Sequence, residues 1–221
     1  MAFKMIDLHT HSIFSDGELI PFELCRRLEV MDYGAVAITD HVDSSNLEIV
    51  IKSLLKAASL WNAHSSLKLI PGVELTHVPP KLIASLTKKA RTLGAKIIVV
   101  HGETLVEPVA PGTNRAALEA DIDILAHPGL ISEEEVILAK ERDICLEISG
   151  RKGHCFSNGH VAKLAKKIGA KIVINSDGHA PSDFLNFEMA KKITLGAGLD
   201  EKDFEESIKN AWNILKKRGV L

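Results

Sequence analysis

The sequence is poor in aromatic residues and carries little net charge, and both shortages argue against nucleic-acid binding. Phe, Trp and Tyr together make up 5% of the 221 residues, whereas proteins that bind single-stranded nucleic acid stack its bases on aromatic side chains. The formal net charge of -2 indicates no broad basic field for a phosphate backbone. Both features argue against a dedicated nucleic-acid groove and make nucleic acid an unlikely partner, although they are compatible with a local basic patch.

Cysteines and long apolar runs are also scarce. Cys25, Cys145 and Cys155 are the three cysteines; they form no CxxC pair and are too few for a disulfide framework. We expect reduced thiols and therefore a cytoplasmic protein. No apolar run reaches the ~18 residues that a membrane span requires, and the first residues, MAFKMIDLHTHS, lack the apolar core of a signal peptide. We expect no membrane contact, and the oligomeric state has no signature in the sequence.

Short apolar runs that alternate with amphipathic stretches are the main pattern present. The runs are rich in Ile, Val and Leu, which is typical of buried parallel strands. The predicted strands cover residues 4–9, 35–39, 67–73, 96–101, 122–127, 144–148 and 171–175. The predicted helices cover residues 21–32, 46–64, 81–93, 113–120, 132–142, 158–168 and 200–217. Seven such β/α units in one chain favour an α/β fold closed into a barrel over an open sheet.

Nine residues of metal-binding types recur at or just after the C-terminal ends of these predicted strands. In a barrel, those strand ends surround one mouth, so residues that are distant in sequence converge there. Imidazole nitrogens and carboxylate oxygens are ligands for zinc, manganese and iron, and one metal needs about four of them. The set therefore predicts a cluster of two or three divalent metal ions and metal-assisted hydrolysis. The nine residues are His9, His11, Asp16, His41, Glu74, His101, His127, Asp177 and His179.

The spacing of the first residues in this set carries further information. His9 and His11 are two positions apart, so they share one face of an extended strand. Asp7 is in phase with them and is predicted to orient a ligand histidine from behind. Asp16 has a second interpretation, because an aspartate before Gly17 is also common in a plain turn.

Several residues in predicted loops and helix starts are candidates for contact with a phosphorylated substrate. Arginine can grip phosphate through two hydrogen bonds, lysine acts as a point charge, and backbone N–H groups at a helix start favour anions. The predicted substrate-binding residues are Arg115, Arg151, Lys152, Ser157 and Asn158. The predicted catalytic residues are His154, His160, Arg115 and Arg151, the histidines as proton donors to a leaving alkoxide. Arg115, Arg151 and Lys152 also have a structural interpretation as solvated side chains, and His154 and His160 have one as surface or capping histidines.

The motifs resemble those of the polymerase and histidinol phosphatase (PHP) family of metal-dependent phosphoesterases. They occur in the family's order: DLHTHSIFSDG at 7–17, TDH at 39–41, GVE at 72–74, HG at 101–102, AHPG at 126–129 and NSDGH at 175–179. The resemblance implies a single PHP domain over residues 1–221, folded as a distorted seven-stranded (β/α)7 TIM-like barrel. It implies a first metal at His9, His11, Glu74 and Asp177, a second at Glu74, His101 and His127, and a third at Asp16, His41 and His179.

The resemblance also implies an enzyme, a hydrolase that cleaves a small phosphate monoester with a metal-activated hydroxide. The segments APGTNRAALEADIDILAHPG and LEISGRKGHCFSNGHV resemble small archaeal-type members assigned as histidinol phosphatases, so L-histidinol phosphate is one candidate substrate. The first alternative is a nucleotide or nucleic-acid phosphodiesterase or nuclease, because PHP modules also serve as nucleases. The second is a non-catalytic RNA- or protein-binding barrel, like the barrel subunit of ribonuclease P.

Overall fold

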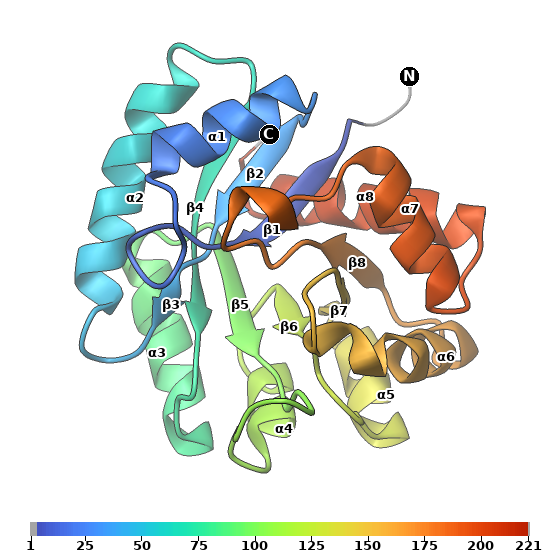
Figure 1. Ribbon diagram of the computed structural model, residues 1–221. Coiled ribbons are helices and arrows are strands. Elements are labelled where there is room, and N and C mark those ends of the chain that lie inside the picture. Colours follow the sequence, from blue (N-terminus) through green and yellow to red (C-terminus); the bar gives the residue numbers. More distant parts are fainter. Residues whose placement is uncertain (1–3, 221) are drawn as a thin grey trace.

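The computed structural model, which describes residues 4–220, is a nearly closed barrel of parallel strands surrounded by helices (Figure 1). Neighbouring strands follow one another along the chain, and the last strand approaches the first. His11 N donates to Gly178 O at 2.9 Å beside a parallel bridge between Thr10 and Gly178. The strands of the barrel are β1 (Ile6–Thr10), β2 (Ala35–Ile38), β4 (Lys68–Leu75), β5 (Ile97–His101), β6 (Ile124–Ala126), β7 (Cys145–Ser149) and β8 (Ile172–Asn175).

This architecture confirms the predicted α/β fold and the seven-stranded TIM-like barrel. The predicted single domain also includes residues 1–3 and 221, which lie outside the described residues. A two-residue strand that was not predicted, β3 (His41–Val42), pairs with β4 just beyond the end of β2. In this register Ile38 pairs with Pro71 and His41 pairs with Glu74. The short strand therefore fixes His41 opposite Glu74.

Helices cover the outside of the barrel, as Figure 1 shows. Seven of them match the predictions: α1 (Pro21–Val30), α2 (Leu47–Asn62), α3 (Pro80–Leu93), α4 (Thr113–Leu118), α5 (Glu133–Glu141), α6 (Asn158–Ile168) and α8 (Glu201–Lys217). Two short 3₁₀ turns, η1 (His154–Ser157) and η2 (Pro181–Asp183), lie in the loops after β7 and β8. Among the described residues, no helix combines the length and the apolar character needed to cross a membrane.

Helix α7 (Phe187–Gly196) was not predicted, and its burial pattern explains why. Only Ala190 and Thr194 are buried, while Phe187 and Met189 are exposed. The helix thus has no continuous apolar stripe, which is the signal that periodicity detects. Its start depends instead on the side chain of Asn186, which accepts a hydrogen bond from Met189 N.

The strands are buried on both faces because the helices cover the outer face and side chains fill the interior. In β5, the four residues from Ile97 to Val100 are at most 1% exposed. Most of the buried polar residues of the strands lie near the strand ends, and Glu147 in the middle of β7 is an exception. Near the start of β6, buried Asp123 accepts hydrogen bonds from Arg91 and Arg218, each at 2.6 Å. An ion-pair network thus lies at the N-terminal end of β6, whereas the buried histidines of the strand ends lie at the opposite end of the barrel.

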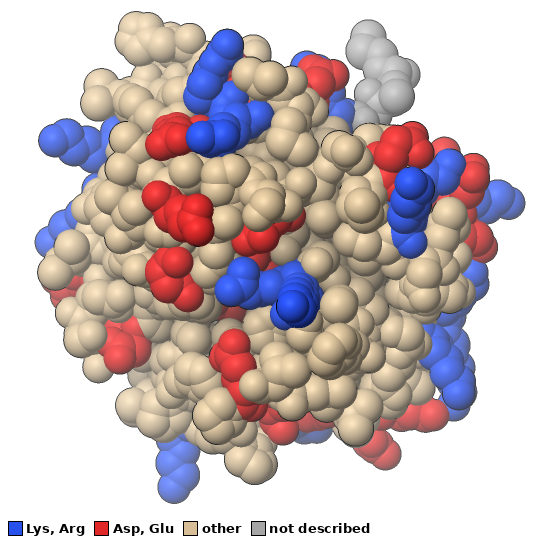
Figure 2. Space-filling model, viewed as in Figure 1, with Lys and Arg blue, Asp and Glu red and all other residues tan. Residues whose placement is uncertain are grey.

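Charged side chains are mixed on the face of the molecule shown in Figure 2. Lys and Arg alternate with Asp and Glu in small groups over a largely uncharged surface, and no continuous basic field is seen on this face. The surface agrees with the small net charge of the sequence.

Candidate metal centre

The four residues of the predicted first metal position lie together at the C-terminal end of the barrel. His9 Nε2 is 3.3 Å from Glu74 Oε1, and His11 Nε2 is 3.2 Å from Asp177 Oδ1. His9 Nε2 also lies 3.8 Å from Asp177 Oδ1. All four side chains are buried. Strands β1 and β4 and the segment after β8 thus bring four potential ligands to one point.

Several atoms in this cluster that could bind a metal have no hydrogen-bond partner among the described residues. They are Nε2 of His9, both ring nitrogens of His11 and of His127, and Oε1 of Glu74, all buried. Leaving a buried polar group unsatisfied costs about 1–3 kcal/mol. The two closest pairs of ligand atoms, 3.2 and 3.3 Å apart, match the roughly 3.3 Å that separates ligands about 2.0 Å from a tetrahedral zinc ion, and the other two pairs are wider at 3.8 Å. These residues therefore fit a divalent metal.

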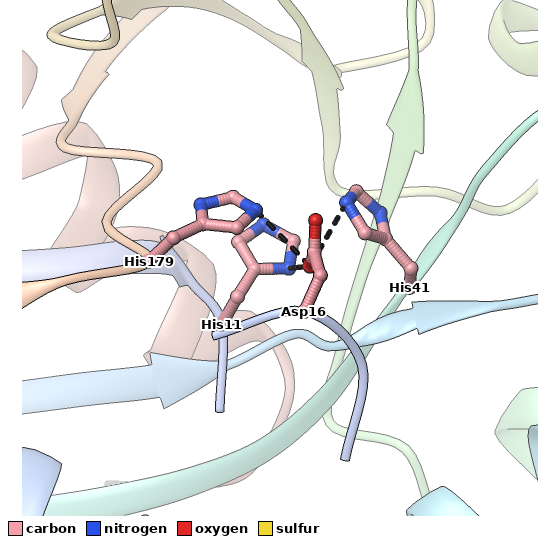
Figure 3. Close-up of side chains that lie close together, drawn as sticks. All are labelled: His11, Asp16, His41 and His179. Atoms are coloured by element: carbon pink, nitrogen blue, oxygen red, sulfur yellow. Dashed lines mark ion pairs between the residues drawn. The ribbon is translucent and has the colours of Figure 1, made fainter. Parts of the chain in front are cut away.

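The residues of the predicted third position surround the Asp16 carboxylate (Figure 3). Asp16 Oδ1 is 3.2 Å from His179 Nε2, 3.4 Å from His41 Nε2 and 4.0 Å from His11 Nδ1. Partial burial opposes ionisation, but the hydrogen bonds from His179 and His41 outweigh it and hold the pKa of Asp16 well below its usual value. Asp16 therefore faces the cluster, although it also lies in a tight loop as its alternative interpretation supposed.

The second predicted position includes one histidine that sequence analysis assigned differently. His101, His127 and His154 offer ligand atoms that all lie within 4.8 Å of one another. The rings of His127 and His154 stack with centroids 4.1 Å apart, and His127 Nε2 is 3.7 Å from Glu74 Oε1. Burial lowers the pKa of His154 to about 4. At neutral pH its imidazole is therefore neutral, which suits a ligand better than the predicted proton donor.

Glu107 is a site residue that sequence analysis missed. Its Oε2 is 3.1 Å from His101 Nε2, and its Oε1 is 3.4 Å from His154 Nε2. The hydrogen bond to His101 is the main reason that the pKa of Glu107 falls to about 2. Glu107 lies in an irregular loop after β5 rather than at a strand end, so no short motif or strand-end rule could identify it.

The carboxylate that orients the ring of His9 is not the predicted one. Asp7 accepts hydrogen bonds from the backbone N–H groups of His9 and Ser176, each at 3.1 Å, rather than from an imidazole. Burial raises the pKa of Asp7 to about 6. The ring of His9 is held instead by Glu147, whose Oε2 is 2.7 Å from Nδ1. A carboxylate in an otherwise apolar strand was a signal for Glu147 that the sequence contained.

Two of the predicted ligands have an unfavourable backbone conformation. His127 has φ of 26° and Asp177 has φ of 52°, a region that residues other than glycine seldom adopt. Such strain persists where the surrounding structure holds the residue in place, and it clusters at functional sites. The conformation therefore supports a functional role for both residues.

Arg151 and His154 are the two predicted catalytic residues that the structure brings to the cluster. Arg151 Nη1 lies 2.8 Å from His179 Nδ1 and 3.3 Å from the carbonyl oxygen of Asp177. Both residues line a small cavity of about 30 Å³. The lining residues are Asp16, His41, His101, Glu107, His127, Arg151, His154, Asp177 and His179.

The other predicted catalytic and substrate-binding residues do not line this cavity. Arg115 is exposed on α4 and pairs with Glu119 at 2.7 Å. Lys152 is exposed and forms no hydrogen bond or ion pair within residues 4–220. Ser157 is buried at the start of α6 without capping that helix. The geometry thus gives no support to the predicted phosphate contacts of these three residues.

Asn158 and His160 have structural partners near the start of α6. The Asn158 side chain accepts from Ser149 N at 3.1 Å and donates to Ser149 O at 2.8 Å, which ties the helix to the end of β7. His160 Nε2 lies 2.7 Å from the carbonyl oxygen of Ile131. Both side chains are committed to the fold, so the predicted roles in phosphate binding and proton donation have no geometric support.

Comparison with known proteins identifies one matching family model and several related proteins. A family model described as PHP domain matches residues 7–176. The uncharacterized protein MJ1295 of Methanocaldococcus jannaschii is 50% identical over 214 residues, covering 96% of this chain and 98% of that protein. A probable phosphatase of Thermoanaerobacter sp. is 37% identical over 94 residues, 36% of this chain and 37% of its own length. The DNA polymerase/3'-5' exonuclease PolX of Bacillus subtilis is 25% identical, and the match covers 97% of this chain and 40% of PolX.

Solved structures share the fold at low sequence identity. A chain of archaeal ribonuclease P, determined with mature tRNA, has a TM-score of 0.70 and 21% identity, with 97% of this chain and 91% of that chain covered. The histidinol phosphate phosphatase of Lactococcus lactis, complexed with zinc, L-histidinol and phosphate, has a TM-score of 0.57 and 16% identity, with 99% and 95% covered.

Proposed function

The chain belongs to the PHP family, and on that premise we propose that it is a metal-dependent phosphatase that hydrolyses a small phosphate monoester. The observation that carries this proposal is the set of buried imidazole and carboxylate atoms that have no hydrogen-bond partner within residues 4–220, in a cluster where Arg151 contacts His179. Two or three zinc, manganese or iron ions fit the donor set. We also propose a cytoplasmic location, since Cys25, Cys145 and Cys155 are free thiols.

The protein's own residues would hold the metals and position the phosphate. His9, His11, Glu74 and Asp177 would hold the first ion, while His101 and His127 would share Glu74 with a second. When bound, divalent ions lower the pKa of water and neutralise developing charge on a phosphate. A third ion fits between Asp16, His41 and His179.

Arg151 is the cation best placed to bind the phosphate directly. It is partly exposed and lies on the cavity wall beside His179 and Asp177. A guanidinium can donate two parallel hydrogen bonds to phosphate oxygens and stabilise charge that increases during the reaction.

Asp40 fixes the loop that carries Asp16. The Asp40 carboxylate accepts hydrogen bonds from Ser12 N at 2.7 Å, Ser12 Oγ at 2.7 Å and Ser15 Oγ at 2.8 Å. These contacts hold the loop from Ser12 to Gly17 over the cavity, so that Asp16 keeps its position opposite His41 and His179.

The substrate class is inferred from the size of the cavity and from the relatives. The cavity is small, about 30 Å³, which leaves room for about two waters at the ~10–15 Å³ that each requires and suits a compact polar group better than an extended polymer. The related probable phosphatase and the histidinol phosphate phosphatase support a monoester, with L-histidinol phosphate as a candidate. The match to PolX over nearly the whole chain favours a nucleotide or nucleic-acid phosphodiesterase as the second candidate.

Phosphate release tests the proposal. The protein loaded with zinc or manganese is incubated with a panel of phosphomonoesters that includes L-histidinol phosphate and mononucleotides. We expect release from at least one small ester and loss of that activity with a chelator. No release from any monoester by protein with verified bound metal, together with cleavage of a phosphodiester, would favour the second candidate.

A further inference from the structure

We propose that Glu107 and His154 are additional metal ligands, which complete the position formed by His101 and His127 at the outer side of the cluster. This inference rests on the proposed metal-dependent function and adds two residues to the ligand set that the family motifs imply. Glu107 comes from the loop after β5 and His154 from the 3₁₀ turn after β7.

The orientation of His154 is the first observation. Thr104 Oγ lies 2.7 Å from His154 Nδ1, and both residues are buried. Because this contact occupies Nδ1, the free nitrogen Nε2 faces the cavity, 3.4 Å from Glu107 Oε1 and 4.0 Å from Asp177 Oδ2. A hydrogen bond to one ring nitrogen that directs the other inward is the usual arrangement of a ligand histidine.

The position of Glu107 is the second observation. Its two carboxylate oxygens lie 3.1 Å from His101 Nε2 and 3.4 Å from His154 Nε2. These separations are close to the roughly 3.3 Å expected between two ligands of a tetrahedral ion. Buried His127, next to His101 and His154, has no hydrogen-bond partner at either ring nitrogen among the described residues. The side chains of His101, Glu107, His127 and His154 therefore have more lone pairs than there are N–H groups to share them. A bound cation would accept these lone pairs.

The loop that carries Glu107 is anchored on both sides. Glu103 Oε1 accepts from Gly112 N and Asn114 N, each at 3.0 Å. Asn114 in turn accepts from Glu103 N and donates to the carbonyl oxygen of Pro128. These bonds join the two ends of the loop to each other and to the segment after β6, so Glu107 is directed to the cavity by a structured loop.

Metal content and affinity test this inference without an activity assay. We propose to compare the wild-type chain with Glu107→Gln, His154→Gln and the double variant, and with Glu134→Gln as a control on the exposed surface of α5. Elemental analysis after gel filtration gives zinc equivalents, competition with a chromophoric chelator gives affinity, and cobalt substitution reports ligand changes through its visible spectrum.

The inference predicts that each variant weakens one metal equivalent by about tenfold or more, that the double variant loses it, and that the control matches the wild type. Each single variant should also change the cobalt spectrum. Unchanged affinity, stoichiometry and spectrum in both single variants and in the double variant would overturn the inference, while the proposed function would stand. A wild-type chain that binds no metal at all would overturn both.

Discussion

Nδ1 of His9 lies 2.7 Å from Oε2 of Glu147, although the two residues are 138 positions apart in the chain. Both side chains are fully buried, and the same carboxylate oxygen accepts from Asn175 Nδ2 at 2.9 Å. The pairing occupies Nδ1 of His9 and leaves Nε2, which has no hydrogen-bond partner within residues 4–220, directed into the cluster. Strand β7 thus determines which nitrogen of a β1 histidine is available.

Replacing Glu147 by Gln tests this arrangement. The change keeps the shape of the side chain but removes its negative charge. That charge orients the His9 ring and makes the His9 imidazole more basic. We expect the affinity of the first metal position to fall by roughly 10- to 100-fold while the circular dichroism spectrum stays unchanged. Competition with a chromophoric chelator measures the affinity. An unchanged affinity would show that His9 does not depend on Glu147 for its metal-binding geometry.

The parts of the site that were predicted from sequence share one property. His9, His101, His127 and Asp177 each follow an apolar run that becomes a strand, and parallel strands in a barrel end at the same mouth. Chain topology alone is therefore enough to bring these residues together. The barrel itself was predictable because its seven strands and all the described helices except α7 have a local sequence pattern.

The parts that were not predicted depend on packing between distant segments. Glu107 reaches His101 through a loop whose shape is set by Glu103 and Asn114, and no local pattern encodes that shape. Conversely, His160 has a side chain that could donate a proton in catalysis, but its imidazole contacts the carbonyl oxygen of Ile131. Residue type predicts chemical ability, and only tertiary contacts decide whether that ability is used.

The pH dependence of stability gives a prediction for a site remote from the cluster. Asp143 pairs with Lys171 at 2.6 Å and Lys217 at 2.9 Å, and chiefly the hydrogen bond from Lys171 lowers the pKa of Asp143 below its ordinary value of 3.8. A lowered folded-state pKa adds stability above the unfolded-state value, and this stability is lost as pH falls through the folded-state value.

Asp143→Asn should therefore destabilise the chain at pH 7 and have less effect well below pH 4. Asn also tolerates the left-handed backbone of this residue, where φ is 56°. Because the pair is about half exposed, we expect a loss of at most about 1 kcal/mol at pH 7. Urea unfolding at the two pH values, with chelator present throughout, measures the difference. An equal loss at both would exclude an electrostatic origin.

Gly129 and Gly112 form a matched pair for the role of glycine near the site. Both have positive φ, 62° and 88° respectively, but a Cβ on Gly129 would lie 1.9 Å from the carbonyl oxygen of Glu103, while a Cβ on Gly112 would meet nothing within 4 Å. Gly112→Ala should cost only the backbone strain, about 1–2 kcal/mol. Gly129→Ala should cost more, because the Glu103 backbone must move. Thermal unfolding of both variants measures this order, and the reverse order would contradict the close approach.

His101→Ala tests whether metal binding stabilises the fold through this cluster. A ligand that binds only the folded state raises stability by RT ln(1 + [L]/Kd), about 2.7 kcal/mol at a hundred times Kd. We expect zinc or manganese to raise the unfolding temperature of the chelator-treated wild type, and a smaller rise for His101→Ala because one ion loses a ligand. Turnover of any substrate found should fall about a hundredfold or more, since metals supply several kcal/mol of transition-state stabilisation.

Glu134→Gln, on the exposed face of α5, should behave as the wild type in both measurements. A His101→Ala chain with the full thermal shift and a near wild-type rate would remove His101 from the site.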